Sequence, residues 1–525
     1  MTRKDCIMDQ TDRYAIELSG IDKRFGDVHA NKHIDLQVRR GSIHGIVGEN
    51  GAGKSTLMSI IYGFYHADNG EMRIFGQPFK PHGSQEAIKA GIGMVHQHFM
   101  LVNNFTVLEN VILGAEQGWH LGQSQATAEK LLGELARDYG LEVPLHEKIE
   151  NLPVGLQQRV EILKALYRGA RILILDEPTG VLTPQEADHL FEVLKKLRDQ
   201  GTTVILITHK LREIMAITDQ VSIMRRGEMV HHVATCDTDK EQLAELMVGR
   251  KVRLKVDKQP ANPGEPLLRV DNLSYVDGSG VERVKSVNFQ VRAGEVVGIA
   301  GVSGNGQSEL LSLLGGILKP SKGAFTIAEH RVDQAHPASA RAVRAMGLGH
   351  VPEDRHKMGL INRFEAQEAY ILGYHHLPDY NKGLLQDKAA ILRECQEKME
   401  KWDVRPPSPT LKTANFSGGN QQKLVIAREV EQDPQVLLVG QPTRGVDIGA
   451  IEYIHQQIIA MRDQGKAVLL VSVELDEIMS LSDRILVIAD GRIVGELDAA
   501  RADEKTLGLM MANIVPDDIA KEAQS

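Results

Sequence analysis

The sequence predicts an α/β protein made of two tandem domains, each with a mainly parallel sheet. Three observations point to this class: a glycine-rich loop that occurs twice, short apolar runs that alternate with helical segments, and landmarks that recur at matching spacing in both halves. The chain has 525 residues, which is more than one hydrophobic core usually holds, so its length also favours two or more domains.

The internal repeat sets the expected domain limits. Gly48 of the first half corresponds to Gly301 of the second, and the later landmarks keep one constant offset: Pro178 and Pro442, Asp219 and Asp483, Gly227 and Gly491. Residues 258–264, which are rich in proline and glycine, separate the two copies and are typical of a linker. We therefore predict a first domain over residues 14–254, a linker over 255–266 and a second domain over 267–515.

Apolar runs mark the expected strands, and helical periodicity marks a separate subdomain. Residues 171–175 and 203–207 are short apolar runs of the kind that form buried parallel strands. Asp490 and Gly491 lie between two further apolar runs and predict a tight hairpin turn. The stretch 100–165 is richer in helical spacing, so we expect a helical subdomain there, set apart from the sheet.

The first half contains a complete phosphate-binding loop, GENGAGKS, at residues 48–55. An apolar run over 43–47 precedes it and a helical pattern starting at Thr56 follows it, which gives the strand–loop–helix order that such a loop needs. Glycines let the backbone N–H groups turn toward phosphates, and the helix N-terminus faces the same charge. The expected nucleotide-binding residues are Gly48, Asn50, Gly51, Ala52, Gly53, Lys54, Ser55 and Thr56. Lys54 is expected to reach the β- and γ-phosphates, and Ser55 to coordinate Mg²⁺.

Five further side chains of the first half are candidates for the same site. Asp176 and Glu177 directly follow an expected strand, so we expect Asp176 to hold Mg²⁺ and Glu177 to accept a proton from the attacking water. His209 follows the next strand and is expected to hydrogen-bond the γ-phosphate. Gln97 can reach Mg²⁺ or the water from a loop. Phe25 is expected to stack on the base, and ordinary core packing is the alternative for this ring.

Composition narrows the function classes. The net charge of −9 argues against a general nucleic-acid binder, which usually shows a basic surface. Cys6, Cys236 and Cys395 are three widely spaced cysteines that offer neither a disulfide framework nor metal-ligand spacing, so we expect a reducing compartment. No run of 18 or more apolar residues occurs, so a role at a membrane is expected to depend on a partner.

The order of these motifs resembles that of ATP-binding cassette (ABC) ATPases, in both halves and from about residue 14 to 515. The tandem form is similar to the ATPase subunits of bacterial importers for simple sugars and nucleosides. Residues 91–102 and 152–168 resemble the nucleoside branch most, and residues 351–355 are also similar to a feature of this importer group. The resemblance implies that each parallel core sheet carries an antiparallel β subdomain and a helical subdomain.

The resemblance also implies a function. It implies an ATPase that uses ATP and Mg²⁺ to power the import of a small solute, as a peripheral protein on the cytoplasmic face of the bacterial inner membrane. Two membrane permease subunits are the implied partners, with an extracytoplasmic solute-binding protein acting indirectly. Nucleosides are the expected cargo, and a simple sugar of the ribose or galactose type is the alternative. A tandem cassette protein without a transport role is a third reading, which the short connector and the acidic charge disfavour.

In this family the signature segment of one copy closes over the nucleotide held by the other copy. The second copy has a nearly complete signature, FSGGNQ, at residues 416–421, and Ser417, Gly418 and Gly419 are expected to approach the γ-phosphate. The first copy has LPVGLQ at residues 152–157. Pro153 offers neither a hydroxyl nor a backbone N–H in that segment.

The second copy has lost the chemistry of its own phosphate site. The corresponding residues are Gln307 for Lys54, Gly440 for Asp176, Gln441 for Glu177, Val473 for His209 and Glu353 for Gln97. Both sets of losses belong to one composite pocket. We therefore predict one working ATP site, which combines the phosphate loop of the first copy with the signature of the second.

An apolar patch follows Gln97 directly. Phe99, Met100, Leu101 and Val102 are candidates to receive a cytoplasmic helix of the permease near the Gln97 and Glu353 loops. Packing into the core of the helical subdomain is the alternative for this patch.

Overall fold

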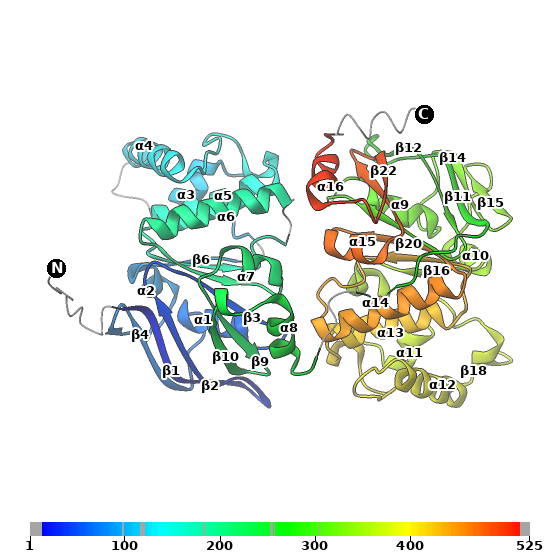
Figure 1. The fold of residues 1–525 in the computed structure, drawn as a ribbon, viewed down its shortest axis with the longest axis horizontal. Coiled ribbons are helices and arrows are strands. Elements are labelled where there is room, and N and C mark those ends of the chain that lie inside the picture. Colours follow the sequence, from blue (N-terminus) through cyan, green and yellow to red (C-terminus); the bar gives the residue numbers. More distant parts are fainter. Residues whose placement is uncertain are drawn as a thin grey trace. The chain divides into compact units, whose positions relative to one another are not determined.

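The structure is a computed structural model that describes residues 13–96, 99–115, 121–180, 182, 184–251, 256, 258–302 and 304–514. The chain divides into two compact units, residues 1–252 and residues 253–525 (Figure 1). The finer limits of the linker over 255–266 remain a prediction.

A six-stranded sheet forms the centre of the first unit, with the strand order β10-β9-β3-β8-β7-β6. Its strands are β3 (Ile43–Gly48), β6 (Ile92–Val95), β7 (Ile172–Asp176), β8 (Thr203–Ile207), β9 (Gln220–Arg225) and β10 (Glu228–Ala234). The neighbours from β9 to β6 pair in parallel, and only β10 is antiparallel, at one edge. Strands β3, β6 and β8 are buried along their whole length, as expected of strands covered on both faces.

The first unit also contains a second, antiparallel sheet. Its order is β2-β1-β4-β5, with β1 (Tyr14–Phe25), β2 (Val28–Arg39), β4 (Asn69–Ile74) and β5 (Gln77–Pro78). Ile16 of β1 and Leu36 of β2 share one buried core with Ile46 of β3 and Leu57 of the first helix. This core joins the two sheets and fixes the helix that follows the phosphate loop between them.

Helices complete the first unit. They are α1 (Lys54–Ile61), α2 (Ser84–Lys89), α3 (Val107–Ile112), α4 (Leu121–Tyr139), α5 (Val154–Tyr167), α6 (Pro184–Asp199), α7 (Leu211–Ile217) and α8 (Lys240–Val248), with short 3₁₀ turns η2 (Ile149–Asn151) and η3 (Thr235–Asp237). In Figure 1 the helices α3, α4 and α5 gather at the end of the unit opposite β1, β2 and β4. The predicted helical subdomain within residues 100–165 is therefore confirmed.

The second unit repeats this architecture. Its central sheet has the order β16-β19-β20-β13-β21-β22, which is the order of the first unit read from the other edge, and its antiparallel sheet is β12-β11-β14-β15. The strands are β11 (Pro266–Val276), β12 (Glu282–Arg292), β13 (Glu295–Ala300), β14 (Lys322–Ile327), β15 (His330–Asp333), β16 (Leu348–Val351), β19 (Val436–Gly440), β20 (Ala467–Ser472), β21 (Arg484–Ala489) and β22 (Arg492–Asp498). A short hairpin of β17 (Asn381–Lys382) and β18 (Leu385–Gln386) has no counterpart in the described part of the first unit.

The helices of the second unit follow the same plan. They are α9 (Gln307–Leu314), α10 (Ala340–Ala345), α11 (Ala366–Tyr370), α12 (Lys388–Lys401), α13 (Gly418–Val430), α14 (Ile448–Asp463), α15 (Leu475–Leu481) and α16 (Glu504–Met511), with the turns η4 (Arg355–Gly359), η5 (Pro378–Tyr380) and η6 (Thr413–Asn415). The expected hairpin joins β21 to β22. Asp490 and Gly491 both have positive φ angles, +46° and +77°, as a tight hairpin turn of this kind requires.

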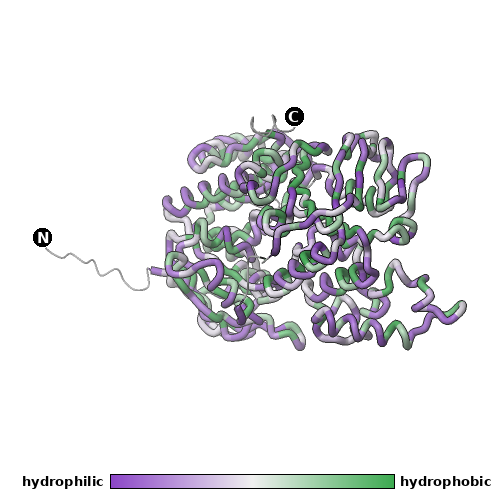
Figure 2. Tube along the Cα trace, turned by 45° about the vertical axis from the view of Figure 1, so that its right-hand side comes forward, coloured by the Kyte–Doolittle hydropathy of each residue, from purple (hydrophilic) through white to green (hydrophobic). Residues whose placement is uncertain are grey.

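Hydrophilic and hydrophobic stretches alternate along the chain (Figure 2). Among the described residues, no helix combines the length and the apolar character that crossing a bilayer requires.

Candidate active site

The loop between β3 and α1 has a backbone that only glycine can adopt at several places. Gly51 and Gly53 have φ angles of +79° and +99°, in the left-handed region that favours glycine. A Cβ on Gly53 would collide with the carbonyl of Ala30 in β2, and a Cβ on Gly48 with the carbonyl of Met224 in β9. The loop is therefore a cradle pressed against two strands. Its form fits a loop whose N–H groups approach phosphates.

Lys54 is buried at the start of α1, and its ammonium group faces the loop. Its Nζ donates hydrogen bonds to the carbonyl oxygens of Gly48, at 2.7 Å, and of Glu49, at 3.0 Å. Burial lowers the pKa of Lys54, while the charges of Glu177 and Asp176 oppose that change. Within the described part of the chain Lys54 forms no ion pair. A buried ammonium held by neutral oxygens fits an anionic ligand such as a triphosphate.

Asp176 ends β7 beside the exposed Ser55 of α1. Burial raises the pKa of Asp176, and a hydrogen bond from the Ser55 hydroxyl opposes that change. A hydroxyl and a carboxylate at one place are oxygen ligands of the type that Mg²⁺ prefers. These two residues therefore fit a magnesium ion next to the phosphate loop.

Glu177 is fixed in a strained backbone conformation next to His209. Its φ angle is +48°, which is unusual for a residue other than glycine, and its N–H donates to the carbonyl of Ile207 at 2.8 Å. Nδ1 of His209 lies 2.9 Å from Oε1 of Glu177. Burial acts to raise the pKa of Glu177, but the hydrogen bond and charge of His209, with the charges of Lys54 and Lys210, lower it overall. Glu177 is thus ionised at neutral pH and able to accept a proton.

Phe25 ends β1 with its ring at the surface. The ring is 42% exposed, meets Tyr65 edge-on with 5.1 Å between the ring centroids, and has Nζ of Lys23 5.4 Å from its centroid. Core packing, the alternative to base stacking, is therefore excluded for this ring.

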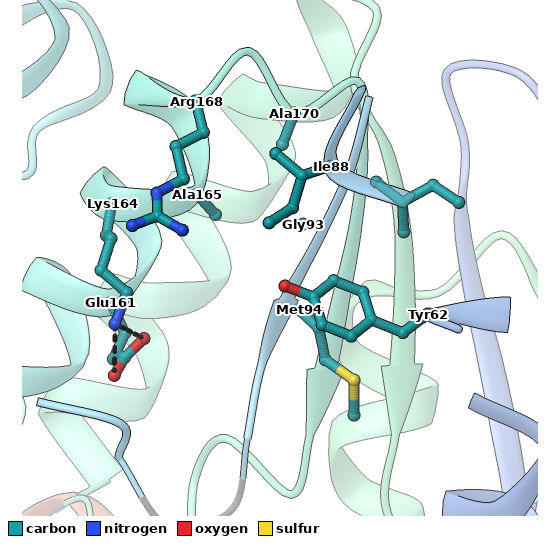
Figure 3. Close-up of a pocket in the computed structure, with 10 residues that line it drawn as sticks. Tyr62, Ile88, Gly93, Met94, Glu161, Lys164, Ala165, Arg168 and Ala170 are labelled. Atoms are coloured by element: carbon teal, nitrogen blue, oxygen red, sulfur yellow. Dashed lines mark hydrogen bonds and ion pairs between the residues drawn. The ribbon is translucent and has the colours of Figure 1, made fainter. Parts of the chain in front are cut away.

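Gln97 lies outside the described residues, so its predicted role stays a prediction. A pocket opens near β6 and α5, where Glu161 and Lys164 form an ion pair at 3.2 Å (Figure 3). Glu161 accepts a hydrogen bond from the N–H of Met100 at 2.7 Å, and Lys164 donates one to its carbonyl at 2.9 Å. Because α5 holds the Met100 backbone while its side chain is 63% exposed, this residue is not part of the subdomain core.

The described residues of the second phosphate loop keep the glycine turns of the first and lack its charge. Gly304 and Gly306 have φ angles of +92° and +97°, and a Cβ on Gly306 would lie 2.5 Å from the carbonyl oxygen of Arg283, just as Gly53 abuts Ala30. Gln307 is buried in the place of Lys54, and its Nε2 has no hydrogen-bond partner in the described part of the chain. The cradle remains, but its ammonium is replaced by an unsatisfied amide.

The space of the missing aspartate is filled from the same unit. A Cβ on Gly440 would lie 2.7 Å from Cγ and 2.9 Å from the backbone nitrogen of Glu353. The Ser308 hydroxyl, which corresponds to that of Ser55, donates a hydrogen bond to Oε2 of Glu353. Burial raises the pKa of Glu353, and the Ser308 hydrogen bond opposes that change. Glu353 thus occupies the hydroxyl of Ser308, whose counterpart in the first unit, Ser55, fits Mg²⁺.

Gln441 keeps the geometry of Glu177 without its chemistry. Its φ angle is +45°, and its N–H donates to the carbonyl of Val471 at 2.8 Å. Its Oε1 accepts a hydrogen bond from the N–H of Val473, at 3.3 Å, where Glu177 meets the imidazole of His209. The strain of the first unit is therefore retained where no general base is present.

The two signature segments differ at the start of their helices. Ser417 is the N-cap of α13, and its Oγ accepts from Nδ2 of Asn420 at 2.9 Å. Pro153 is the N-cap of α5 and its side chain makes no capping hydrogen bond, while Val154 follows it with its side chain 43% exposed. The second unit therefore presents a hydroxyl and two glycines at a helix N-terminus, and the first unit does not.

Some buried polar residues near the site had no clear signal in the sequence. Glu213 of α7 accepts a hydrogen bond from Thr179, and burial raises the pKa of Glu213. Nε2 of Gln158 in α5 donates to the carbonyl of Pro178 at 2.6 Å. These contacts hold the turn after Glu177. Polar residues on a helix usually mark a solvated face, so only the packed structure identifies these two as buried.

Comparisons with known proteins identify the family. The family model described as ABC transporter matches residues 31–180 and 284–444, one match in each half. The nucleoside import ATP-binding protein NupA of Lactococcus lactis is 44% identical over 94% of this chain and 97% of its own length. The guanosine import ATP-binding protein NupO of Bacillus subtilis is 44% identical over 97% of this chain and 99% of its own. The glucose import ATP-binding protein TsgD13 of Haloferax volcanii is 45% identical over 94% of this chain and 95% of its own length.

The family is therefore established by sequence matches that extend over both units and nearly the whole chain. The predicted fold class, with two cassettes that each contain a mainly parallel sheet, an antiparallel sheet and a helical subdomain, is confirmed. This chain belongs to the ABC transporter family, as an ATPase with two ATP-binding cassettes in tandem.

Proposed function

We propose that the first phosphate site hydrolyses ATP and that the second does not. One observation carries this proposal: two backbone frames with the same positive-φ positions, at Gly53 and Glu177 and at Gly306 and Gln441, hold opposite chemistry. The first frame presents Lys54, Asp176, Glu177 and His209, and the second presents Gln307, Gly440, Gln441 and Val473.

The first site binds the triphosphate through its loop and Lys54. The N–H groups of residues 48–55 surround the phosphates, and the Lys54 ammonium exchanges its bonds to carbonyl oxygens for bonds to phosphate oxygens. Bound Mg²⁺ neutralises part of the phosphate charge, and Ser55, Asp176 and Gln97 would hold it. Phe25 contributes its exposed ring to the base.

Glu177 is the general base of the proposed reaction. Its lowered pKa keeps it ionised, so it accepts the proton of the attacking water. His209 holds the Glu177 carboxylate through the 2.9 Å contact, and we assign its imidazole to the γ-phosphate. The strained backbone at Glu177 keeps this pair in one orientation.

The signature of the second unit completes the site. Ser417, Gly418 and Gly419 stand at the N-terminus of a helix of 13 residues, which favours a negatively charged partner. We assign them to the γ-phosphate of the nucleotide held by the first unit. The degenerate signature, with Pro153 and Val154, is left to the degenerate phosphate site, so that all losses fall in one composite pocket.

The work supported by hydrolysis is import of a small solute. Two of the similar proteins are named for nucleoside or guanosine import, at 44% identity, and together with the resemblance of residues 91–102 they support nucleosides as cargo. Sugar import is the second candidate, because a glucose import protein is 45% identical and xylose and ribose import proteins are 34–37% identical.

Transport requires partners that cross the membrane. We assign two permease subunits and, indirectly, an extracytoplasmic solute-binding protein, with this chain as a peripheral protein at the cytoplasmic face of the bacterial inner membrane. The segment Phe99–Val102 is the proposed docking place for a permease helix, because its backbone is held by Glu161 and Lys164 while Met100 is exposed.

A matched pair of variants tests the single-site proposal. Glu177→Gln removes the base and is expected to lower ATPase turnover by roughly 10²- to 10⁴-fold. Gln441→Ala changes the corresponding residue, in the same backbone conformation, and is expected to leave turnover close to that of the unmodified chain. Equal loss in the two variants would contradict the asymmetry.

The cargo is tested in cells. A strain that lacks this chain is given labelled nucleosides and labelled ribose, galactose and glucose, and uptake is compared with that of a strain carrying the restored gene. Loss of nucleoside uptake alone supports the nucleoside assignment. Unchanged nucleoside uptake with loss of sugar uptake would replace it by the sugar alternative.

A further inference from the structure

Arg355 of the second unit forms hydrogen bonds to segments outside the phosphate loop. Its Nη1 and Nη2 donate hydrogen bonds to the carbonyl oxygens of Arg444, at 2.6 Å, and of Gly445, at 3.2 Å. Its Nε donates to Oε1 of Gln421, at 3.2 Å, in the first turn of the signature helix α13. One guanidinium therefore joins three segments: η4, α13 and the turn after Gln441.

The same guanidinium packs directly on the signature glycine. A Cβ on Gly418 would lie 2.7 Å from Nη2 of Arg355 and 2.5 Å from the carbonyl oxygen of Gly445. Gln421, which accepts from Arg355, also donates through Nε2 to the carbonyl of Thr413 at 2.9 Å. The first turn of α13 is thus held from two sides, and Gly418 is confined against the arginine and the turn.

The hydrogen-bond acceptors of Arg355 are uncharged. In the part of the chain that the structure describes, Arg355 takes part in no ion pair, and its acceptors are two backbone carbonyls and an amide. Burial and the charge of the neighbouring Arg444 lower the pKa of Arg355, and the charge of the adjacent Asp354 opposes that change. The half-buried guanidinium adds positive charge beside a helix N-terminus, which favours the approach of an anion to that end.

The first unit lacks this arrangement. By the match of Gln97 to Glu353, Phe99 corresponds to Arg355, and Val154 stands at the place of Gly418. The arginine and the glycine signature are therefore both present in one unit and both absent from the other. Arginine contacts of this forked kind cannot be made by phenylalanine.

We infer that Arg355 is a positioning residue for ATP hydrolysis, which holds the signature segment Ser417–Gly419 in register with the turn at Arg444 and Gly445. This inference rests on the proposed function, because it takes the signature of the second unit to act on the nucleotide of the first. Arg355 touches no reacting atom in this role. It fixes the place at which the Ser417 hydroxyl and the helix N-terminus meet the phosphate.

The test compares three variants of the full chain in ATPase assays. Arg355→Ala is expected to lower kcat by roughly 10- to 100-fold with little change in KM, because a misplaced signature costs orientation rather than nucleotide binding. Arg355→Lys keeps the charge but not the fork, so it is expected to recover only part of the rate. Arg405→Ala is the matched control, since that side chain is 79% exposed and pairs with Asp403. It is expected to match the unmodified chain.

Two further measurements separate positioning from stability and from the proposed function. Thermal unfolding is recorded for every variant, and a rate loss in Arg355→Ala that vanishes after correction for the folded fraction would overturn the inference. The double variant Arg355→Ala/Ser417→Ala is expected to lose little more than the worse single variant, because both act through the signature. Additive losses, or a normal kcat in Arg355→Ala, would also overturn it.

Glu177→Gln in the same series separates a failure of the proposed function from a failure of the role of Arg355. If Glu177→Gln hydrolyses ATP normally, the proposed function fails. If Glu177→Gln is inactive while Arg355→Ala is fully active, only the role of Arg355 fails.

Discussion

The loop at residues 48–55 and the described residues of the loop at 301–308 share their glycine turns and carry different chemistry. Both turn through glycines with positive φ, both press a glycine against a carbonyl of the neighbouring antiparallel sheet, and both precede a helix of eight residues. The first encloses a buried ammonium and the second a buried amide with an unsatisfied Nε2. The shape of the loop is thus set by packing and glycine, and its chemistry by a few side chains that packing does not require.

The largest expected difference between the loops is in nucleotide affinity. Lys54→Gln makes the first loop like the second, and MgATP binding by the full chain is expected to weaken by roughly 10- to 100-fold as charge-assisted hydrogen bonds are lost. Gln307→Ala is the matched control and is expected to leave the affinity unchanged. Fluorescence titration with a labelled ATP analogue measures both. The same loss in each variant would show that the two loops bind alike.

The two signatures are expected to differ in the room they leave for a side chain at their second residue after the leading aromatic or aliphatic one, Gly418 in the second unit and Val154 in the first. Gly418→Val is expected to destabilise the second unit by about 1–3 kcal/mol, because a side chain there meets Arg355 and the carbonyl of Gly445. Val154→Gly changes the corresponding exposed residue of the first unit, and its cost is expected to stay below about 1 kcal/mol. Urea unfolding measures each effect. A Gly418→Val chain as stable as the parent would contradict the packing argument.

Removing the signature hydroxyl is expected to have a smaller effect on turnover. Ser417→Ala is expected to slow ATP hydrolysis by about tenfold, since it removes one hydrogen bond toward a charged phosphate. Pro153→Ser adds a hydroxyl to the degenerate signature and is expected to change little. Initial rates of ATP hydrolysis at saturating ATP, measured well below the unfolding temperature, compare the two variants with the unmodified chain. The reverse pattern would mean that each signature serves the other pocket.

The smallest expected difference between the two sites is in the pH dependence of stability. Because the pKa of Glu177 is lowered in the folded chain, its ionisation stabilises the fold above the unfolded value of 4.5, and this contribution is lost as the pH falls through the lower folded pKa. The unfolding temperature of the unmodified chain relative to Glu177→Gln should therefore be constant above about pH 4.5 and decrease below it. Gln441→Ala carries no titratable group at the corresponding place and should show no such trend. A difference that grows toward acid pH would show that the pKa of Glu177 is raised.

The local patterns in the sequence were sufficient for much of the fold and site. Strand–loop–helix order at residues 43–61 and the strand runs before Asp176 and His209 are local signals, and the structure has the corresponding elements. The pairing of Glu353 with Ser308 was out of reach, because it depends on how the ends of β13 and β16 lie in the sheet.

The contacts of Arg355 were out of reach for the same reason. Residues 355, 421 and 445 are far apart in the chain, and only the packed second unit brings them to one guanidinium. The exposure of Phe25 also depends on tertiary packing, since an aromatic residue at the end of a strand occurs equally in cores and at surfaces.

The crowding at Gly440 makes the loss of the second site hard to reverse by one substitution. A Cβ at position 440 would meet both the side chain and the backbone nitrogen of Glu353, so an aspartate there requires the main chain at residue 353 to shift. Restoring catalysis there would also require the lost groups at positions 307, 441 and 473, so no single substitution is sufficient.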